Sequence, residues 1–295
     1  MKKYVAMVLV LVLILTATAC SNNNHALSQI YEVDSGSLSG EYNHDMNVLP
    51  FQIDSIQEDL VGKTMTFQTD TKTYSLIYDV TIFYPDSDLK VHKYKINGSE
   101  YGEICFKEDG SVYKFLDFDE QICILDIEPT DTAEMVHTAL APAISDFVDV
   151  SKYENWSVIS SPGVDNMFGQ YMFYYYNMVQ GYYADQTFVI VEDDGRVRMI
   201  GIDDIDFDTS SIGTISKDRE NELLQERIKS ICSTSGLQYI SYEIADAPCT
   251  PYFRYCGGEL CIKYVISCKA YDADTEENTS FSSTLLIPVR LLTES

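Results

Sequence analysis

Residues 171–202 read YMFYYYNMVQGYYADQTFVIVEDDGRVRMIGI, and this stretch decides how the chain folds. Aromatic and β-branched residues, which favour strands, fill most of it. Two turn signals, Gln180-Gly181 and Asp193-Asp194-Gly195, interrupt it. The pattern therefore predicts three consecutive antiparallel strands at 171–179, 187–192 and 196–202, joined by tight turns.

The first of these strands is apolar on both faces. Because side chains of a strand alternate between its faces, Phe173 and Tyr175 point to one side and Tyr174 and Tyr176 to the other. A helix is expected to cover one face. The other face is covered either by a neighbouring module, which is the commoner arrangement, or by a ligand. Since tyrosines offer flat area and a hydroxyl for peptide or sugar contact, Tyr174 and Tyr176 are the candidate binding residues.

Helical patterns precede two strand-rich regions. One helix begins near Asp131, where an acidic capping box with Glu134 is expected, and Pro142 should kink or split it. The second is capped by Ser216. Upstream, 64–127 reads as strand after strand. The sequence predicts an α+β, β-rich fold: an N-terminal antiparallel β unit followed by two helix-plus-antiparallel-meander modules.

Five segments follow from these patterns. They are an N-terminal segment at 1–19, a flexible polar tether at 20–47, an antiparallel β unit at 48–128, and α+β modules at 129–210 and 211–295; the lipoprotein resemblance described below makes 1–19 a signal peptide and 20–47 a lipid-anchored tether. The tether is expected because its polar stretch has no apolar periodicity.

The stretch quoted above also resembles a PepSY-type extracytoplasmic module. The resemblance rests on Tyr171 through Ile202, with Val179-Gln-Gly-Tyr182 in a turn and residues 188–197, FVIVEDDGRV, behind it. In that family a helix packs across a small antiparallel sheet, and modules occur in tandem on secreted or anchored bacterial proteins. The resemblance implies a binding or protease-modulating role rather than an active site.

The N-terminus resembles a bacterial lipoprotein signal. Lys2 and Lys3 precede an apolar run from Tyr4 to Thr16. This run is shorter than the roughly 20 residues that a spanning helix needs. The segment 15–21, LTATACS, resembles a lipobox, although Ala17 stands where leucine is usual. The resemblance implies cleavage before Cys20 and acylation of that cysteine, which would anchor the protein in the cell membrane on its extracytoplasmic side.

Charge excludes one class of partner. Asp and Glu total 46 against 20 Lys and Arg, a formal net charge of −26. Because nucleic acid would be repelled, it is not an expected partner.

The eight cysteines do not form the closely spaced pairs of a structural zinc site. Outside the cell, disulfides or buried thiols are expected instead, and Cys256 and Cys261 flank a hairpin turn that a disulfide could bridge. The acids from Asp203 to Asp208 lack the glycine and the final glutamate of an EF-hand, so either a looser calcium site or a solvated acidic linker remains. No cofactor is expected.

No catalytic pattern emerges from the sequence. His92 and His137 are isolated, and surface or capping roles are the commoner ones for such residues. The sequence therefore predicts a non-enzymatic, membrane-anchored lipoprotein that binds a peptide, protein or glycan. The alternatives are a cell-envelope hydrolase with unidentified catalytic residues, or a transporter-associated solute-binding protein, which the absence of two large βα-alternating lobes disfavours.

Overall fold

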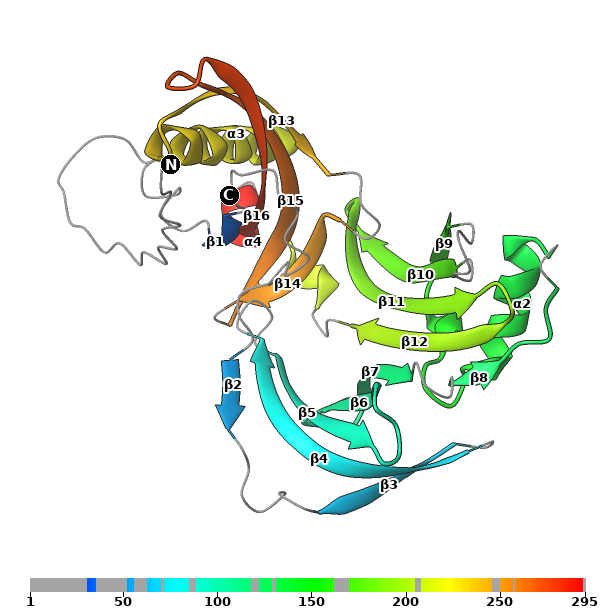
Figure 1. Ribbon diagram of the computed structural model, residues 1–295. Coiled ribbons are helices and arrows are strands. Elements are labelled where there is room, and N and C mark those ends of the chain that lie inside the picture. The colour runs from blue at the N-terminus through cyan, green and yellow to red at the C-terminus, as the bar shows by residue number, and fades with distance from the viewer. Residues whose placement is uncertain are drawn as a thin grey trace. The chain divides into compact units, whose positions relative to one another are not determined.

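The fold is described from a computed structural model (Figure 1). The structure describes residues 31–35, 52–55, 63–69, 72–84, 89–117, 122–128, 131–161, 170–204, 208–245, 250–256 and 258–293. The chain divides into two compact units. The central unit comprises residues 49–211 and 247–260, and the terminal unit comprises residues 1–48, 212–246 and 261–295.

The central unit is built mainly from strands. They are β2 (Gln52–Ser55), β3 (Thr64–Gln68), β4 (Thr73–Tyr84), β5 (Leu89–Ile96), β6 (Gly102–Lys107), β7 (Val112–Asp117), β8 (Cys123–Ile124), β9 (Asn155–Ser161), β10 (Gln170–Val179), β11 (Tyr182–Glu192), β12 (Arg196–Asp203) and β14 (Tyr252–Cys256). The helices are α2 (Ala133–Ala143) and two short 3₁₀ turns, η1 (Val150–Lys152) and η2 (Thr209–Ser211).

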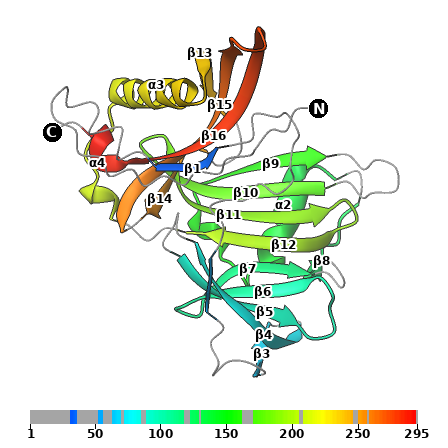
Figure 2. The same ribbon diagram turned by 60° about the vertical axis from the view of Figure 1, so that its left-hand side comes forward.

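One sheet runs through this unit in the order β9-β10-β11-β12-β7-β6-β5-β4. Each of these neighbouring pairs is antiparallel, whereas β14 joins the end of β11 in parallel. The sheet curves, and α2 lies across one side of β9–β12 (Figures 1 and 2). The prediction of a β-rich fold with few helices is confirmed.

A hydrophobic core lies under α2. Val136 and Leu140 of α2 share it with Phe173 of β10 and with Ile104 and Phe115 of β6 and β7, all fully buried. The segments 48–128 and 129–210, predicted as separate modules, thus belong to one unit. The physical reason is that β7 pairs with β12, with Phe115 opposite Ile200, and this pairing removes two exposed sheet edges.

Helix α2 corrects two details of the sequence analysis. Its N-cap is Thr132, whose side chain accepts from the Met135 amide, while Asp131 accepts from the Glu128 amide 2.8 Å away. The expected pair of Asp131 with Glu134 does not form. Pro142 lies in the last turn and the helix ends one residue later, so Pro142 marks its end rather than splitting it.

The terminal unit contains β1 (Tyr31–Ser35), α3 (Lys217–Thr234), β13 (Leu237–Ile244), β15 (Glu259–Asp272), β16 (Glu277–Pro288) and the single-turn α4 (Val289–Leu292). Its strands follow the order β1-β16-β15-β13, all antiparallel. Ser216 caps α3 as predicted, accepting from the Arg219 amide. The helix buries a face that includes Leu224, Ile228 and Cys232.

Strand β1 corrects the predicted tether. Residues 31–35 pair with β16, with Tyr31 opposite Leu286, so these five residues belong to a sheet. Sequence reasoning missed this strand because a short edge strand can be held by main-chain hydrogen bonds alone, without apolar periodicity. The remainder of 20–47, together with Cys20 and the signal segment 1–19, lies outside the described residues.

Candidate functional site

Strand β10 separates its aromatic residues as the sequence predicts. Phe173 and Tyr175 lie in the core under α2, with exposed fractions of 0% and 2%. Tyr174 and Tyr176 point to the opposite face and are half-buried. The helix therefore supplies one cover of this strand, and the second face is the candidate binding surface.

This second face extends across neighbouring strands. The register places Ile159, Met172, Ile190 and Met199 in one row across β9–β12, and Tyr174 beside Phe188 in the next row. We call the six residues Met172, Tyr174, Tyr176, Phe188, Ile190 and Met199 the tyrosine face. All six are half-buried. Its composition, rich in aromatic rings and methionines, is typical of surfaces that adapt to apolar partners.

The two tyrosines are held by other side chains. The Tyr174 hydroxyl donates to the Met172 sulfur, and its ring lies 6.4 Å from the Phe188 ring. The Tyr176 ring meets Tyr183 edge-on, with centroids 4.8 Å apart. These contacts fix the orientation of both rings, so the face is already formed without a ligand.

Phe188 lies flat on the sheet because its neighbour is a glycine. A Cβ at Gly201, directly opposite on β12, would be 2.3 Å from a ring carbon of Phe188. Sequence reasoning missed both residues. Their signal was a glycine inside a strand, which often marks close approach of another group.

A charged pair borders the tyrosine face. In register with Tyr176 lie Gln186 and Asp203, and Arg254 of β14 donates to both carboxylate oxygens of Asp203. The Gln186 amide nitrogen is 3.4 Å from Asp203 Oδ2. The sequence could not indicate Arg254, since it lies 51 residues from Asp203 and carries no motif.

Asp204 belongs to a second polar cluster. The Tyr153 hydroxyl donates to Asp204 Oδ1 at 2.7 Å and lies 2.5 Å from the Thr187 hydroxyl, while Lys152 pairs with the same carboxylate. The pKa of Tyr153 is raised above its ordinary value, mainly by burial and to a smaller extent by the negative charge of Asp204. Through these hydrogen bonds Tyr153 ties η1 to the sheet.

These contacts bear on the calcium hypothesis. The Asp203 carboxylate forms an ion pair with Arg254, and the Asp204 carboxylate forms one with Lys152. Asp208 accepts a hydrogen bond from the Ser210 amide at 2.9 Å. Asp206 lies outside the described residues. Within the described ranges no group of three His, Cys, Asp or Glu side chains is placed to hold a metal ion. Cations of the protein itself therefore neutralise the described acids at 203 and 204.

His137 and His92, which lie in the described part of the chain, contact neighbouring side chains. His137 stacks on Trp156, with ring centroids 4.3 Å apart, and burial lowers its pKa. His92 Nδ1 lies 2.9 Å from the Thr81 hydroxyl.

The structure contains no disulfide among the described cysteines. Cys256 ends β14 and Cys261 lies near the start of β15, and the structure joins neither in a disulfide, so the proposed bridge stays a prediction. Burial raises the pKa of Cys105 to about 12, which makes that thiol a poor nucleophile at neutral pH.

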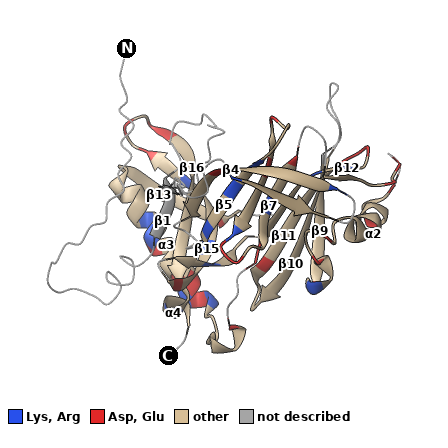
Figure 3. Cartoon of the chain, turned by 90° about the horizontal axis from the view of Figure 1, so that it is seen from below, with Lys and Arg blue, Asp and Glu red and all other residues tan. Residues whose placement is uncertain are grey.

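A lysine cluster continues the same face of the sheet. Glu103 accepts from Lys93 at 2.5 Å and from Lys114 at 2.7 Å, and Lys95 lies 3.2 Å from Asp79. Figure 3 shows basic positions in blue on β5. Burial alone would raise the pKa of Glu103, but the two lysines hold it below its ordinary value. This cluster is an ion-pair network on an otherwise acidic protein.

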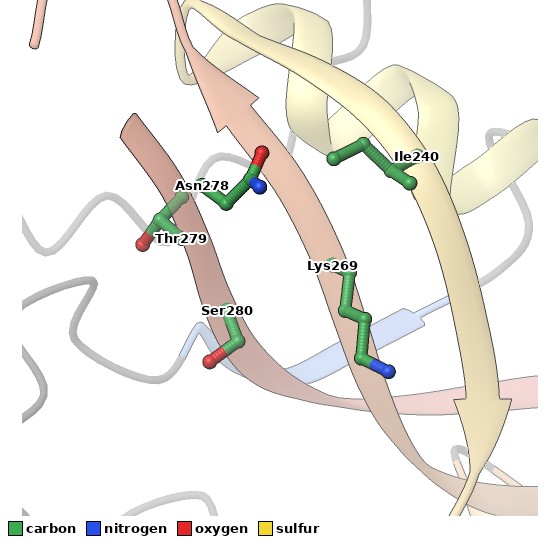
Figure 4. A pocket seen from close by; sticks show the side chains of 5 residues that line it. All are labelled: Ile240, Lys269, Asn278, Thr279 and Ser280. Atoms are coloured by element: carbon green, nitrogen blue, oxygen red, sulfur yellow. The ribbon is translucent and has the colours of Figure 1, made fainter. Parts of the chain in front are cut away.

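The terminal unit has a shallow pocket of about 320 Å³ (Figure 4). It is lined by Ile240, Lys269, Asn278, Thr279 and Ser280, from β13, β15 and β16. The lining contains no carboxylate, histidine or cysteine, and Lys269 Nζ lies 3.7 Å from Glu243. The pocket therefore offers a contact surface of hydroxyl, amide and ammonium groups beside the exposed Ile240.

Three comparisons with known proteins were negative. No family model, no curated protein and no solved structure matches the chain. Within the described part of the chain, no helix is long and apolar enough to cross a membrane.

Proposed function

We propose that this chain is a lipid-anchored extracytoplasmic protein that binds a partner polypeptide through the tyrosine face, without catalysing a reaction. The observation that carries the proposal is the asymmetry of β9–β12. One face is packed under α2, whereas the other presents half-buried tyrosine, phenylalanine and methionine side chains. Aromatic and methionine side chains of this kind are typical of binding surfaces.

An extended polypeptide fits this surface better than a sugar does. Strand β9 pairs with β10 in unbroken register and has no second strand neighbour among the described residues. Its sequence, NWSVISS, contains no charge and no proline, the devices that usually protect an edge from a further strand. A partner strand added to β9 would lie beside Ile159, which is 43% exposed and opposite Met172.

The anchoring part of the proposal rests on the N-terminal signal. Acylation of Cys20 would hold the binding surface outside the membrane and restrict its search for partners to the envelope. The finer fold proposal follows the PepSY resemblance: α2 with β9–β12 and α3 with β13–β16 would be two versions of one helix-plus-meander plan. The order of elements supports it, a helix followed by four strands each time. Strand β14, which joins β11, departs from it.

The test uses a phage-displayed library of random peptides, selected on the purified protein. Wild type should enrich uncharged peptides rich in β-branched and aromatic residues. Tyr174→Ala/Tyr176→Ala and the edge variant Ile159→Lys should lose that enrichment. Tyr101→Ala is the matched control, because Tyr101 is 60% exposed and lies at the β5–β6 turn, away from the face.

A glycan array is run with the same proteins. Glycan binding that depends on Tyr174 and Tyr176, without peptide enrichment, would replace the polypeptide with a sugar. Equal binding by wild type and the double variant in both assays would refute the tyrosine face as the binding surface.

A further inference from the structure

Two thiols meet in the core of the terminal unit. Cys232, in the last turns of α3, and Cys268, in the middle of β15, have sulfur atoms 3.8 Å apart. Both residues are buried, with exposed fractions of 1% and 0%.

The local structure explains why they face each other. On α3, Leu224, Ile228 and Cys232 are four residues apart and form one buried stripe. On β15, Cys268 is buried and points away from the exposed Lys269 that lines the pocket. Helix and strand thus present cysteines to each other at one contact point in the buried interior of the unit.

We propose that Cys232 and Cys268 are joined by a disulfide in the mature protein, which links α3 covalently to β15. The sulfur atoms need to approach by about 1.8 Å to reach the length of an S–S bond, a movement within the range of side-chain rotation and a small shift of the helix. The inference uses the extracytoplasmic location proposed above, because disulfides persist in oxidising compartments.

The chemistry balances with a disulfide oxidant. A thiolate of one cysteine attacks the oxidant's disulfide, and the mixed disulfide is then displaced by the second thiolate. One S–S bond forms in the protein and the oxidant's S–S bond breaks, and the two thiol protons and two electrons pass to the oxidant, which becomes two thiols. An exchangeable disulfide such as oxidised glutathione or an envelope thiol oxidoreductase fills this role.

The timing of the step follows from burial. Burial, together with the neighbouring thiol, raises the pKa of Cys268 to about 12, and burial also raises the pKa of Cys232. Little thiolate therefore exists in the folded state at neutral pH. The bond should form while the chain folds, before α3 packs on β15, and should afterwards resist reductants until the unit unfolds.

Tryptic mapping under non-reducing conditions tests the pairing on protein isolated from its own envelope. Cys232 lies in the fragment 230–254, Cys268 in the fragment 264–269, and both Cys256 and Cys261 in the fragment 255–263. The proposal expects 230–254 linked to 264–269. Because Cys249 shares the fragment with Cys232, the link must persist in Cys249→Ser and vanish in Cys232→Ser; Cys123→Ser is the control that keeps it.

The bond should also be visible in stability. Reduction in urea followed by refolding under reducing conditions should lower the melting temperature by roughly 8–15 °C in wild type, and Cys232→Ser should show no such change.

A second arm separates this inference from the proposed location. Reduced, unfolded protein is refolded with oxidised glutathione. The extracytoplasmic location would be contradicted if fragments 230–254 and 264–269 become linked in the refolded protein while both cysteines are thiols in the protein isolated from cells. Failure to form it in both preparations would overturn the disulfide itself.

Discussion

The close approach of Phe188 to Gly201 makes the tyrosine face sensitive to one methyl group. In Gly201→Ala, the new Cβ would lie 2.3 Å from a carbon of the Phe188 ring, so the ring must leave its place on the sheet. Overpacking of this kind costs about 1–3 kcal/mol. The backbone conformation does not oppose the substitution, because the φ angle of Gly201 is not positive.

The sign of the effect should reverse when the ring is removed. In a Phe188→Ala background the same Gly201→Ala change meets no ring, and replacing a strand glycine with alanine should then stabilise by about 0.5–1 kcal/mol. The double-mutant cycle should therefore give a coupling free energy of about 1.5–4 kcal/mol between the two positions. Phe188→Ala alone should cost about 1–2 kcal/mol, less than a fully buried ring, because Phe188 is half-buried.

Urea unfolding followed by tryptophan fluorescence measures this cycle. The chain has one tryptophan, Trp156 on β9, so the signal reports on the central unit. A Gly201→Ala cost that is the same in both backgrounds would refute the packing of Phe188 over Gly201. Loss of peptide enrichment in Gly201→Ala, with every residue of the tyrosine face retained, would further connect the face to binding.

Three further predictions concern other parts of the molecule. Cys20→Ala should lose metabolic palmitate labelling and leave the membrane fraction; equal labelling of wild type and variant would exclude acylation at this residue. Burial lowers the pKa of His137 below its ordinary value of 6.5, so the unfolded chain binds more protons than the native state near that pH. The free energy of unfolding should therefore fall as the pH drops through 6.5. His137→Phe should remove this part of the pH dependence in urea midpoints measured above and below 6.5; an unchanged dependence would argue against it. Phe173→Ala, under α2, should lower the free energy of unfolding by about 3–5 kcal/mol, whereas Tyr174→Ala should lower it clearly less. Comparable losses in urea unfolding would mean that the tyrosine face is as buried as the core.

Local patterns predicted much of the secondary structure. The strands predicted at 171–179 and 196–202 agree with β10 and β12 to within one residue at each end, and Ser216 caps α3 as expected. The division of β10 into a face under α2 and a face with Tyr174 and Tyr176 also follows from alternation alone. These features depend on neighbours within a few residues, so a sequence read in one dimension contains them.

The associations between distant segments came from tertiary structure. The pairings of β7 with β12 and of β1 with β16, the contact of Arg254 with Asp203, and the approach of Cys232 to Cys268 join residues far apart in the sequence. No periodicity marks them, because any strand edge can satisfy its hydrogen bonds with several others and any buried cysteine can face many side chains. Which pairs form is decided by how α2 and α3 bury their apolar faces, since that choice sets which edges and which side chains lie within reach.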